Sequence, residues 1–304
     1  ALEGIVARNA HLNRPSAFED EVFFTTSSVK EIDISEKIDK APNDKESLIV
    51  WLQKSEATDT QTRFYRSNWP DLCSNPEHFK SCADALLELS SKHHAHPLNR
   101  WREMLSAWGR SKICSETWNL YGDSTLNTLP NNILQHLNNL LADWIKKSAQ
   151  SQGDIDTIVA ACQKLFLLTT INPPPTDNTE TPPDADTTLI NTIANLTDAM
   201  IAAWFRTSPK ENSFIEENFR KFLENIVDSN DSLYDAAKII TTLNASGYYA
   251  VDKAWTTKYI IPLFDWEKNK RNAILAFRGL IWSSNVDVSL LNAIKPDFLA
   301  CAKH

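Results

Sequence analysis

The chain has 304 residues, with 31 Lys and Arg against 39 Asp and Glu, which gives a formal net charge of -8 and a pI near 5.4. This acidic balance argues against a general nucleic-acid or anionic-membrane surface, because such surfaces need clustered Lys and Arg. Only 6 glycines occur, fewer than a sheet protein with many tight turns would need, and no G-x-G-x-x-G or G-x-x-x-x-G-K-[ST] loop is present to hold a phosphate.

The first part of the chain predicts a weakly ordered start followed by helices. Residues 1–45 show little periodicity, whereas Leu48 and Leu52 mark a first helical stripe. We expect Asn75-Pro76-Glu77 to begin the next helix, with proline at its first position. A second helix is expected at 99–110, and we expect the two to form a helical hairpin. The apolar positions of this pair are Phe79, Ala83, Leu86, Leu87, Trp101, Leu105 and Trp108.

Further apolar stripes at helical spacing continue through the chain. They predict helices at 133–145 after Pro130, at 155–166 with Asp154 as the N-cap, at 189–204, at 214–226, and from Asp231 to Leu243. About ten helices joined by short turns, with no alternating strand pattern between them, suit stacked helix pairs better than a four-helix bundle. The predicted fold is therefore all-α, an irregular HEAT-like α-solenoid of stacked helical hairpins, although no residue signature recurs as a strict repeat.

A proline-rich interruption at 172–188 divides this pattern. It holds five of the 14 prolines, in Pro173-Pro174-Pro175 and Pro182-Pro183, together with Asp, Thr and Glu. We expect it to be neither helical nor buried. The predicted domains are an N-terminal helical lobe at 1–171, a connector at 172–188 and a C-terminal helical lobe at 189–304. The alternative is a long surface loop within one continuous solenoid.

The densest run of aromatic residues and prolines lies at 255–299. Trp255, Ile260 and Ile261 predict a helix that Pro262 ends. Leu263, Phe264 and Trp266 predict a buried corner, with Asp265 a candidate cap for the following helix. That helix is expected over 273–282, with Ala273, Ala276, Phe277, Leu280 and Ile281 on its apolar face. A last short helix, with Leu290, Leu291 and Ile294, is expected to stop at Pro296.

Four motifs in this last quarter carry a resemblance to a known family. In order they are Trp255, Pro262-Leu263-Phe264-Asp265-Trp266, Gly279-Leu280-Ile281-Trp282-Ser283 and Lys295-Pro296-Asp297-Phe298-Leu299. They resemble the C-terminal helical region of bacterial anti-phage proteins of the defence-associated sirtuin type, with a looser likeness at 69–108. In that family the region is known mainly as a domain of unknown function. Where the family has Trp-Ser-Pro-Arg, this chain reads Trp282-Ser283-Ser284-Asn285.

The resemblance implies that an N-terminal sirtuin-like domain, which destroys NAD, precedes such a region in the full-length protein. The chain begins with Ala1 and its two methionines are internal, so we expect a piece of a longer protein, with a processed N-terminus as the alternative. Because the phosphate-binding glycine loops are missing, no nucleotide site is expected in the chain itself. The motif residues are interpreted as structural.

Few residues are candidates for chemistry. His93, His94 and His96 form an H-H-x-H group, but adjacent side chains on a helix point about 100° apart, so we interpret them as a polar helix end. The carboxylates at Glu216-Glu217 and at Asp265 and Glu267 are interpreted as solvated. The basic groups at Lys146-Lys147 and at Lys268, Lys270 and Arg271 are interpreted in the same way. No G-x-S-x-G, H-E-x-x-H or DD-x-x-D motif occurs, and so no catalytic, cofactor-binding or metal residue is predicted.

Cysteines and tryptophans are both expected mainly in the core. The five cysteines are odd in number and never paired as C-x-x-C, which fits reduced buried thiols: Cys73, Cys82, Cys114, Cys162 and Cys301. The ten tryptophans could mark binding hot spots, but we expect most of them to fill gaps between helices. No apolar run reaches the roughly 20 residues of a membrane span and no signal pattern begins the chain, so a soluble cytoplasmic location is predicted.

Together these observations predict a non-catalytic helical sensing or assembly region of a bacterial anti-phage protein. Its expected partner is a protein, either a phage component or its own effector domain or subunit, with homo-oligomerisation through the full-length protein as an option. No cofactor, nucleic acid or membrane is expected to bind. The alternatives are an enzyme whose site assembles from dispersed residues, and a passive spacer or oligomerisation module.

Overall fold

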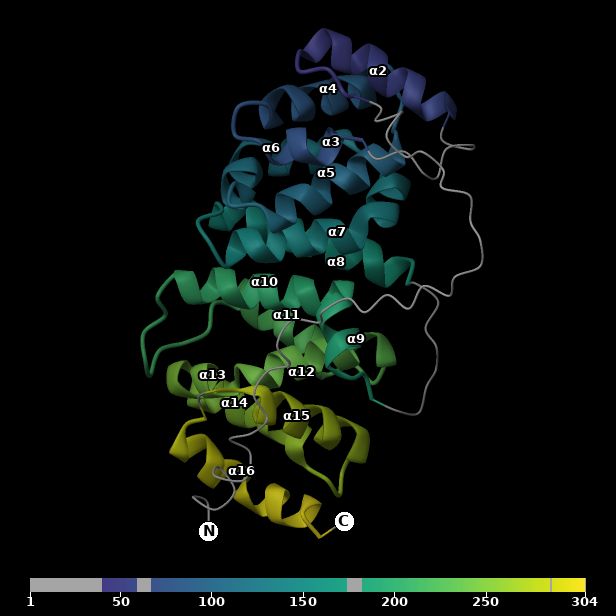
Figure 1. Cartoon of the computed structure of the whole chain (residues 1–304). Helices are drawn as coiled ribbons and strands as arrows, with labels where there is room; N and C mark the ends of the chain where they lie inside the picture. Colours follow the sequence, from purple (N-terminus) through teal and green to yellow (C-terminus); the bar gives the residue numbers. More distant parts are fainter. Residues whose placement is uncertain (1–39, 59–66, 174–181, 285, 304) are drawn as a thin grey trace, which may run out of the picture. The chain divides into compact units, whose positions relative to one another are not determined.

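The computed structural model describes residues 40–58, 67–173, 182–284 and 286–303. All of them belong to the compact unit Ile38–His304. Every regular element within these residues is a helix, fifteen of them α-helices and two of them short 3-10 helices, and none is a strand (Figure 1). The predicted all-α class is therefore confirmed for the described residues. The weak order expected of residues 1–45 falls almost wholly outside them.

Five of the first seven described helices follow predicted apolar stripes, whereas the helices at 69–74 and 114–128 lie where no helix is predicted. The seven are α2 (Lys45–Thr58), α3 (Trp69–Ser74), α4 (Phe79–Lys92), α5 (Leu98–Arg110), α6 (Cys114–Thr128), α7 (Asn131–Ala149) and α8 (Ile155–Ile171). Pro130 precedes α7 as its N-cap residue. The Asp154 side chain caps α8 as predicted, because it accepts a hydrogen bond from the Thr157 N–H at 2.9 Å.

The second half of the described chain is divided more finely than the sequence predicts. It contains α9 (Ala185–Ile190), α10 (Thr192–Arg206), α11 (Glu217–Val227), η2 (Ser232–Tyr234), α12 (Asp235–Leu243), α13 (Ala245–Val251), α14 (Lys253–Tyr259), η3 (Ile261–Phe264), α15 (Lys270–Trp282) and α16 (Val288–Cys301). The stripe predicted at 189–204 is two helices, since α10 begins afresh at Asn191, whose side chain accepts from the Ala194 N–H.

The start of α4 differs from the prediction. Residues 76–78 form a turn, in which the Asn75 side chain accepts from the Glu77 N–H at 2.8 Å, and the helix begins only at Phe79. The Asn-Pro pair therefore shapes the turn before the helix and does not open the helix itself.

The predicted hairpin of α4 and α5 is wrong, because α3 lies between them. Helix α4 packs on α2, α3 and α6, whereas α5 packs on α3, α6 and α7. Hydrogen bonds from two indole groups hold α3 against α5. Trp108 of α5 donates to the Cys73 carbonyl of α3 at 2.9 Å, and Trp69 of α3 donates to the Arg100 carbonyl of α5 at 3.1 Å. Two buried indole N–H groups thus find partners across this contact.

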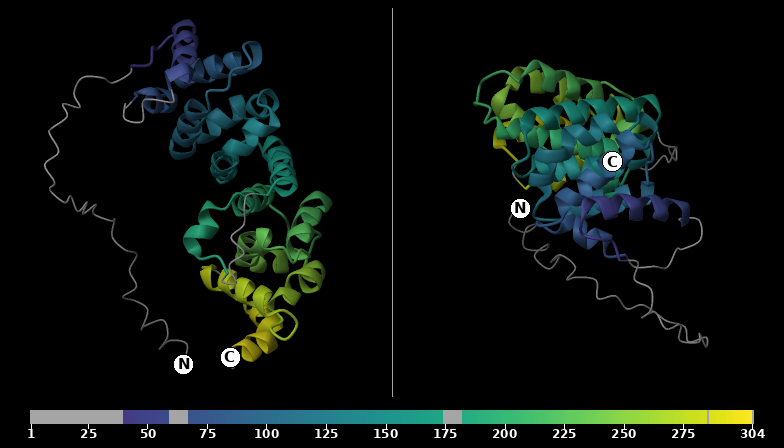
Figure 2. Two further views of the ribbon diagram at one scale, coloured as in Figure 1. Left: turned by 90° about the vertical axis from the view of Figure 1, so that its right-hand side faces the viewer. Right: turned by 90° about the horizontal axis from the view of Figure 1, so that it is seen from above.

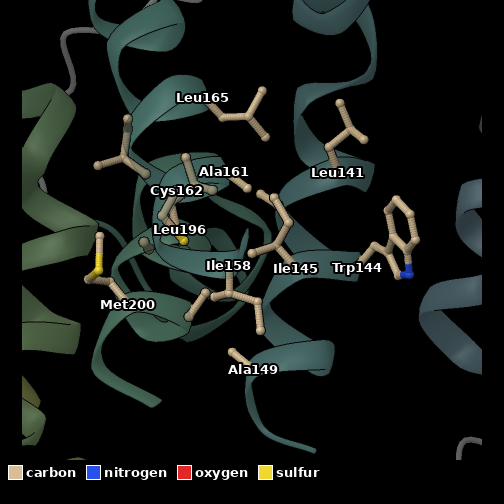
Figure 3. Packing of buried hydrophobic residues seen from close by; sticks show 14 of the residues in the cluster. Leu141, Trp144, Ile145, Ala149, Ile158, Ala161, Cys162, Leu165, Leu196 and Met200 are labelled. Atoms are coloured by element: carbon tan, nitrogen blue, oxygen red, sulfur yellow. The ribbon is translucent and has the colours of Figure 1, made fainter. Parts of the chain in front are cut away.

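The middle of the core is formed by α7, α8 and α10 (Figure 3). Figure 3 shows Ile145 of α7 beside Ile158 and Ala161 of α8, with Leu196 and Met200 of α10 close to them. Trp144 points the other way, where its ring contacts Trp108 and Trp118 with centroids 4.9 and 4.8 Å apart. Helix α7 thus packs against α8 and α10 on one side and against the tryptophan rings on the other, within a single buried cluster. The turned views of Figure 2 show the same succession of helices.

The expected connector at 172–188 is partly helical and partly buried, contrary to prediction. Asp184 caps α9 by accepting from the Thr187 N–H at 2.8 Å, and the Thr188 side chain is fully buried. The prolines do not prevent this, because Pro182 and Pro183 precede the helix. Residues 174–181 lie outside the described residues. Helix α10 packs on α7 and α8, and the division into two lobes stays a prediction.

The C-terminal helices follow the prediction with two exceptions. Helix α14 ends at Tyr259, just before Pro262, as expected. The cap of α15 is Asn269, which accepts from the Asn272 N–H, while Asp265 accepts from the Lys268 N–H within the preceding turn. Pro296 does not stop the last helix, since α16 continues through it to Cys301. A proline removes one N–H and crowds one carbonyl, and this exposed helix tolerates that loss.

Candidate protein-binding surface

The motif residues of the C-terminal region separate into a buried group and an exposed group. Trp255, Leu263, Phe264 and Gly279 are buried. The Trp255 indole donates to the Glu224 carboxylate of α11 at 2.9 Å, and the rings of Phe264 and Phe277 are in edge-to-face contact. Trp255 thus connects α14 to α11, and Phe264 connects η3 to α15.

At Gly279, α15 lies close against the backbone of α12. A Cβ placed on Gly279 would overlap the Ile239 carbonyl oxygen and the Thr242 hydroxyl of α12. Nearby, the Arg271 guanidinium pairs with the buried Asp235 carboxylate, its Nε lying 2.8 Å from Oδ2. The α12–α15 contact therefore combines a backbone-to-backbone approach with a charged hydrogen bond.

The rest of the motif residues are less buried. Pro262, Asp265, Trp266 and Asp297 are half-buried, and Trp282, Lys295, Pro296 and Phe298 are exposed. Burial and the neighbouring Asp265 carboxylate raise the pKa of Asp297. Ile281 and Leu299 are exposed as well, so six of the motif side chains face solvent. These exposed residues are the ones available to a partner.

Exposed apolar side chains are concentrated on the last two helices. Of the fourteen large apolar side chains that are exposed in the described residues, seven belong to α15 and α16. Four of them form what we call the α16 strip, defined as Val288, Leu291, Phe298 and Leu299. Successive residues of an α-helix turn by about 100°, so the strip occupies one arc of about 100°.

The α16 strip lies beside the face that attaches α16 to the rest of the chain, and at its edge the Phe298 ring contacts Phe277 of α15 with centroids 5.8 Å apart. Leu290 and Ile294 are buried, at 0% and 1% exposure, and α16 packs on η3 and α13. Val288 and Phe298 are 68% and 54% exposed. A helix with an inner apolar face and a second, solvent-facing apolar strip is typical of a surface that another molecule covers.

The polar candidates named from the sequence do not form a reaction centre. His93 is the C-cap residue of α4, as the polar-helix-end interpretation expects, and His94 adopts a left-handed φ of 52°. Glu217 pairs with Lys221 on the surface of α11. Lys146 and Lys147 lie 3.3 and 3.5 Å from the carboxylates of Asp198 and Asp143. Among the residues that the structure describes, no three His, Cys, Asp or Glu side chains gather as metal ligands.

A hollow of about 540 Å³ lies beside the start of α8. Its polar groups bind the chain itself. The Asn119 carboxamide accepts from the Asp154 N–H at 2.7 Å and donates to the Gln152 carbonyl at 3.3 Å, and Arg206 donates to the Ala149 carbonyl at 3.2 Å. These contacts hold the α7–α8 turn in place.

A second hollow, of about 300 Å³, lies between α10, α13 and the end of α15. Phe205 and Trp282 line it together with Gly247 and small polar residues. The Phe205 ring lies directly over Gly247, where a Cβ would come within 2.5 Å of Cζ. The described residues that line this hollow include no carboxylate, histidine or cysteine.

Most cysteines and tryptophans are core residues, as predicted. Cys73, Cys82, Cys114 and Cys162 are buried free thiols, and Cys301 is half-buried. All ten tryptophans lie in the described residues. Trp51 and Trp266 are half-buried and Trp282 is 36% exposed, whereas the remainder are buried: Trp69, Trp101, Trp108, Trp118, Trp144, Trp204 and Trp255.

The α16 strip was missed by sequence reasoning. Its four apolar residues do recur at helical spacing, which is a usable signal. It was hidden by the expectation that Pro296 ends the helix, because Phe298 and Leu299 then fall outside it. Leu291 and Ile281, predicted on the buried faces, are in fact exposed at 43% and 77%.

Comparison with known proteins finds no matching family model, no matching curated protein and no matching solved structure. Among the described helices, none combines the length and the apolar character that spanning a lipid bilayer requires.

Proposed function

We propose that this chain is a protein-binding helical region with no catalytic centre of its own. The observation that carries the proposal is the α16 strip, where large apolar side chains face solvent beside a helix face that is already buried. Apolar surface of this kind is stabilised when another protein removes it from water. The hollow near α8 supports the proposal, because its Asn119, Asp154 and Arg206 side chains already bond the chain itself.

We infer that the helices form an irregular, HEAT-like solenoid. The support is that helices pack on the next helix but one: α2 on α4, α3 on α5, α4 on α6, α5 on α7, α8 on α10 and α10 on α12. In stacked helical arrays each unit contacts mainly its neighbours. Within the described residues, α16 packs on η3 and α13 and leaves the α16 strip exposed.

The resemblance of the C-terminal motifs to defence-associated sirtuin-type proteins supplies a biological setting for this proposal. In that setting the region is a cytoplasmic sensing or assembly region of an anti-phage protein, and its partner is a phage component or a neighbouring subunit. Binding would favour one arrangement of the helices and thereby control an attached NAD-degrading effector. The difference in the partner's affinity for the two arrangements limits how far binding can shift the equilibrium between them.

The test pairs two aspartate substitutions in the α16 strip, Leu291→Asp and Leu299→Asp, with a matched control. Leu120→Asp is the control, because Leu120 is 51% exposed on α6, away from the strip. Binding of the chain to purified phage structural proteins and to itself is measured by pull-down and by sedimentation. We expect at least one of these associations in the unsubstituted chain, retained in the control and weakened at least tenfold in the paired variant.

An unsubstituted chain that stays monomeric and retains no structural protein at any concentration would overturn the proposal. Self-association without a phage partner would assign the strip to oligomerisation. Association that survives both strip substitutions would move the binding surface elsewhere. A phage-defence assay in which strip substitutions have no effect would favour a passive spacer.

A further inference from the structure

A groove of about 550 Å³ lies between α8 and α11, away from the α16 strip. We call it the α8/α11 groove. Both helices pack on α10, so α10 lies behind the groove and holds its two walls. The gap is bridged by aromatic rings: the Phe166 centroid is 4.8 Å from that of Phe222 and 5.9 Å from that of Tyr234. The groove therefore has an apolar aromatic floor and a volume within the range of ordinary ligand sites.

The two walls repeat one pattern of side chains. On α8, Gln163 lies one turn before Phe166 and Leu167 and Thr170 lies one turn after them, and all four residues line the groove. On α11, Asn218 and Asn225 flank Phe222 in the same way. Residues at i, i+3, i+4 and i+7 share one face of a helix, so each wall has an apolar centre with neutral polar groups at both ends.

The polar groups at the ends of the groove suit a polypeptide backbone. Each carboxamide of Asn218, Asn225 and Gln163 offers both a donor and an acceptor, which is the combination that a peptide unit presents. All three side chains are exposed. Seven residues along a helix span about 10 Å, which matches about three residues of extended chain.

The charge of Lys221 in the groove favours peptides that carry a carboxylate. Of the described residues that line it, Lys221 is the one with a charge, and no carboxylate lines it. The Lys221 ammonium pairs with Glu217, 2.5 Å away, which lies outside the lining, and both side chains are well exposed. Such a surface pair is worth little and can exchange partners. A carboxylate on the occupant would compete with Glu217 for the Lys221 ammonium, and no carboxylate among the described lining residues opposes it.

The apolar surface at this place extends beyond the groove. Leu167, in the α8 wall, is 58% exposed, and Ile171, one turn further along α8, is 63% exposed. A large side chain entering over the aromatic floor would cover Leu167 as well, and this added burial of apolar area favours binding.

We propose that the α8/α11 groove binds a short extended peptide segment that carries a large apolar side chain next to a carboxylate. The apolar side chain lies on Phe166 and Phe222, the peptide units bond the carboxamides of the walls, and the carboxylate pairs with Lys221. This site is independent of the α16 strip and adds a ligand class to the protein-binding role.

The test uses three capped tetrapeptides as probes: acetyl-Asp-Phe-Asp-Leu-amide, its lysine counterpart acetyl-Lys-Phe-Lys-Leu-amide, and acetyl-Asp-Ser-Asp-Ser-amide. Binding is followed by NMR through the Leu167 methyl groups and the side-chain NH2 signals of Asn218 and Asn225. We expect saturable shifts of these signals with the first peptide, at least tenfold weaker binding of the other two, and weaker binding at higher salt.

Three variants locate the site. Leu167→Asp should weaken binding of the first peptide at least tenfold, and Lys221→Gln should weaken it several-fold and remove most of its salt dependence. Leu120→Asp, which adds the same charge to an exposed leucine of α6, should leave binding unchanged. Because these three residues are exposed, all variants should keep the far-ultraviolet spectrum of the parent.

Equal shifts with all three peptides, shifts confined to signals outside the groove, or binding unaffected by Leu167→Asp would each overturn the inference. The paired α16 variant, Leu291→Asp with Leu299→Asp, separates this result from the proposed function. It should weaken association with large partners at least tenfold and leave peptide binding intact. Failure of the peptide test alone leaves the α16 strip as the binding surface.

Discussion

Gly279 is the residue at which the contact between α12 and α15 allows no side chain. An alanine there would place its Cβ against the Ile239 carbonyl and the Thr242 hydroxyl, and these are held by the backbone of α12. We expect Gly279→Ala to destabilise the chain by about 1–3 kcal/mol, since overpacking forces the two helices apart. Urea unfolding followed by circular dichroism measures this change.

Gly109 provides the matched control for that substitution. It also lies within a helix, but the first atom its Cβ would meet is the Asp143 carboxylate at 3.0 Å, a side chain that can move. Gly109→Ala should therefore be neutral or stabilising by up to about 1 kcal/mol, through the higher helix propensity of alanine. Equal losses in the two variants would contradict the explanation by close backbone approach.

At the scale of one element, α16 is a helix that contains a proline. Pro296 has no N–H to donate to the carbonyl of Asn292, and its side chain is exposed. We expect Pro296→Ala to restore that hydrogen bond and to strengthen α16 by about 2 kcal/mol, after allowance for the freer unfolded chain. Amide hydrogen exchange along α16 should slow correspondingly.

The control for this prediction is Pro130→Ala. Pro130 precedes α7 as its N-cap residue, where no intrahelical N–H is missing, so the exchange rates of α7 should change little. If Pro296→Ala left the exchange of α16 unchanged or made it faster, the proline would be supporting the helix end and the expectation would be wrong.

At the scale of the whole molecule, the buried core should make the chain sensitive to alkali. Burial raises the pKa of the Cys73 and Cys162 thiols above the ordinary 9.0, and raises the pKa of the Tyr248 phenol above 10.0. Groups whose pKa is higher in the folded state stabilise it fully below the unfolded value, and this contribution is lost as the pH rises. The free energy of unfolding should therefore fall once the pH exceeds about 9.

One buried group acts in the opposite direction. Burial lowers the pKa of Lys238, whose ammonium lies 2.5 Å from the Ser229 carbonyl oxygen and 2.9 Å from Asn272 Oδ1. The contribution of Lys238 to the free energy of unfolding rises with pH up to 10.5. The two thiols and the phenol are three groups with the opposite effect, so we expect the net free energy of unfolding to fall. Urea midpoints measured across this range test the sum. Thiolate absorbance that develops while the circular dichroism stays native would contradict the prediction.

Helical class and most helix positions could be predicted from the chain alone. The stripes of α5, α7 and α8 predicted those helices within a few residues, and Asp154 was recognised as a cap, because periodicity and capping depend on neighbours in sequence. The same local reasoning fails at α16. Pro296 predicts the end of the helix, but the helix continues through it to Cys301 and includes the apolar residues Phe298 and Leu299.

The sequence by itself determined that this chain folds as helices with thiols and indoles inside, since spacing and composition act over a few residues at a time. Only the tertiary structure decided that α3 separates α4 from α5, that Gly279 lies against α12, and that Leu291 and Leu167 remain exposed. These outcomes depend on which stripes meet, and the residues that meet are distant in sequence. An apolar residue at a helical position has the same spacing in the sequence whether another helix buries it or it stays exposed to solvent. Spacing alone therefore does not distinguish a core residue from a surface residue that could bind a partner.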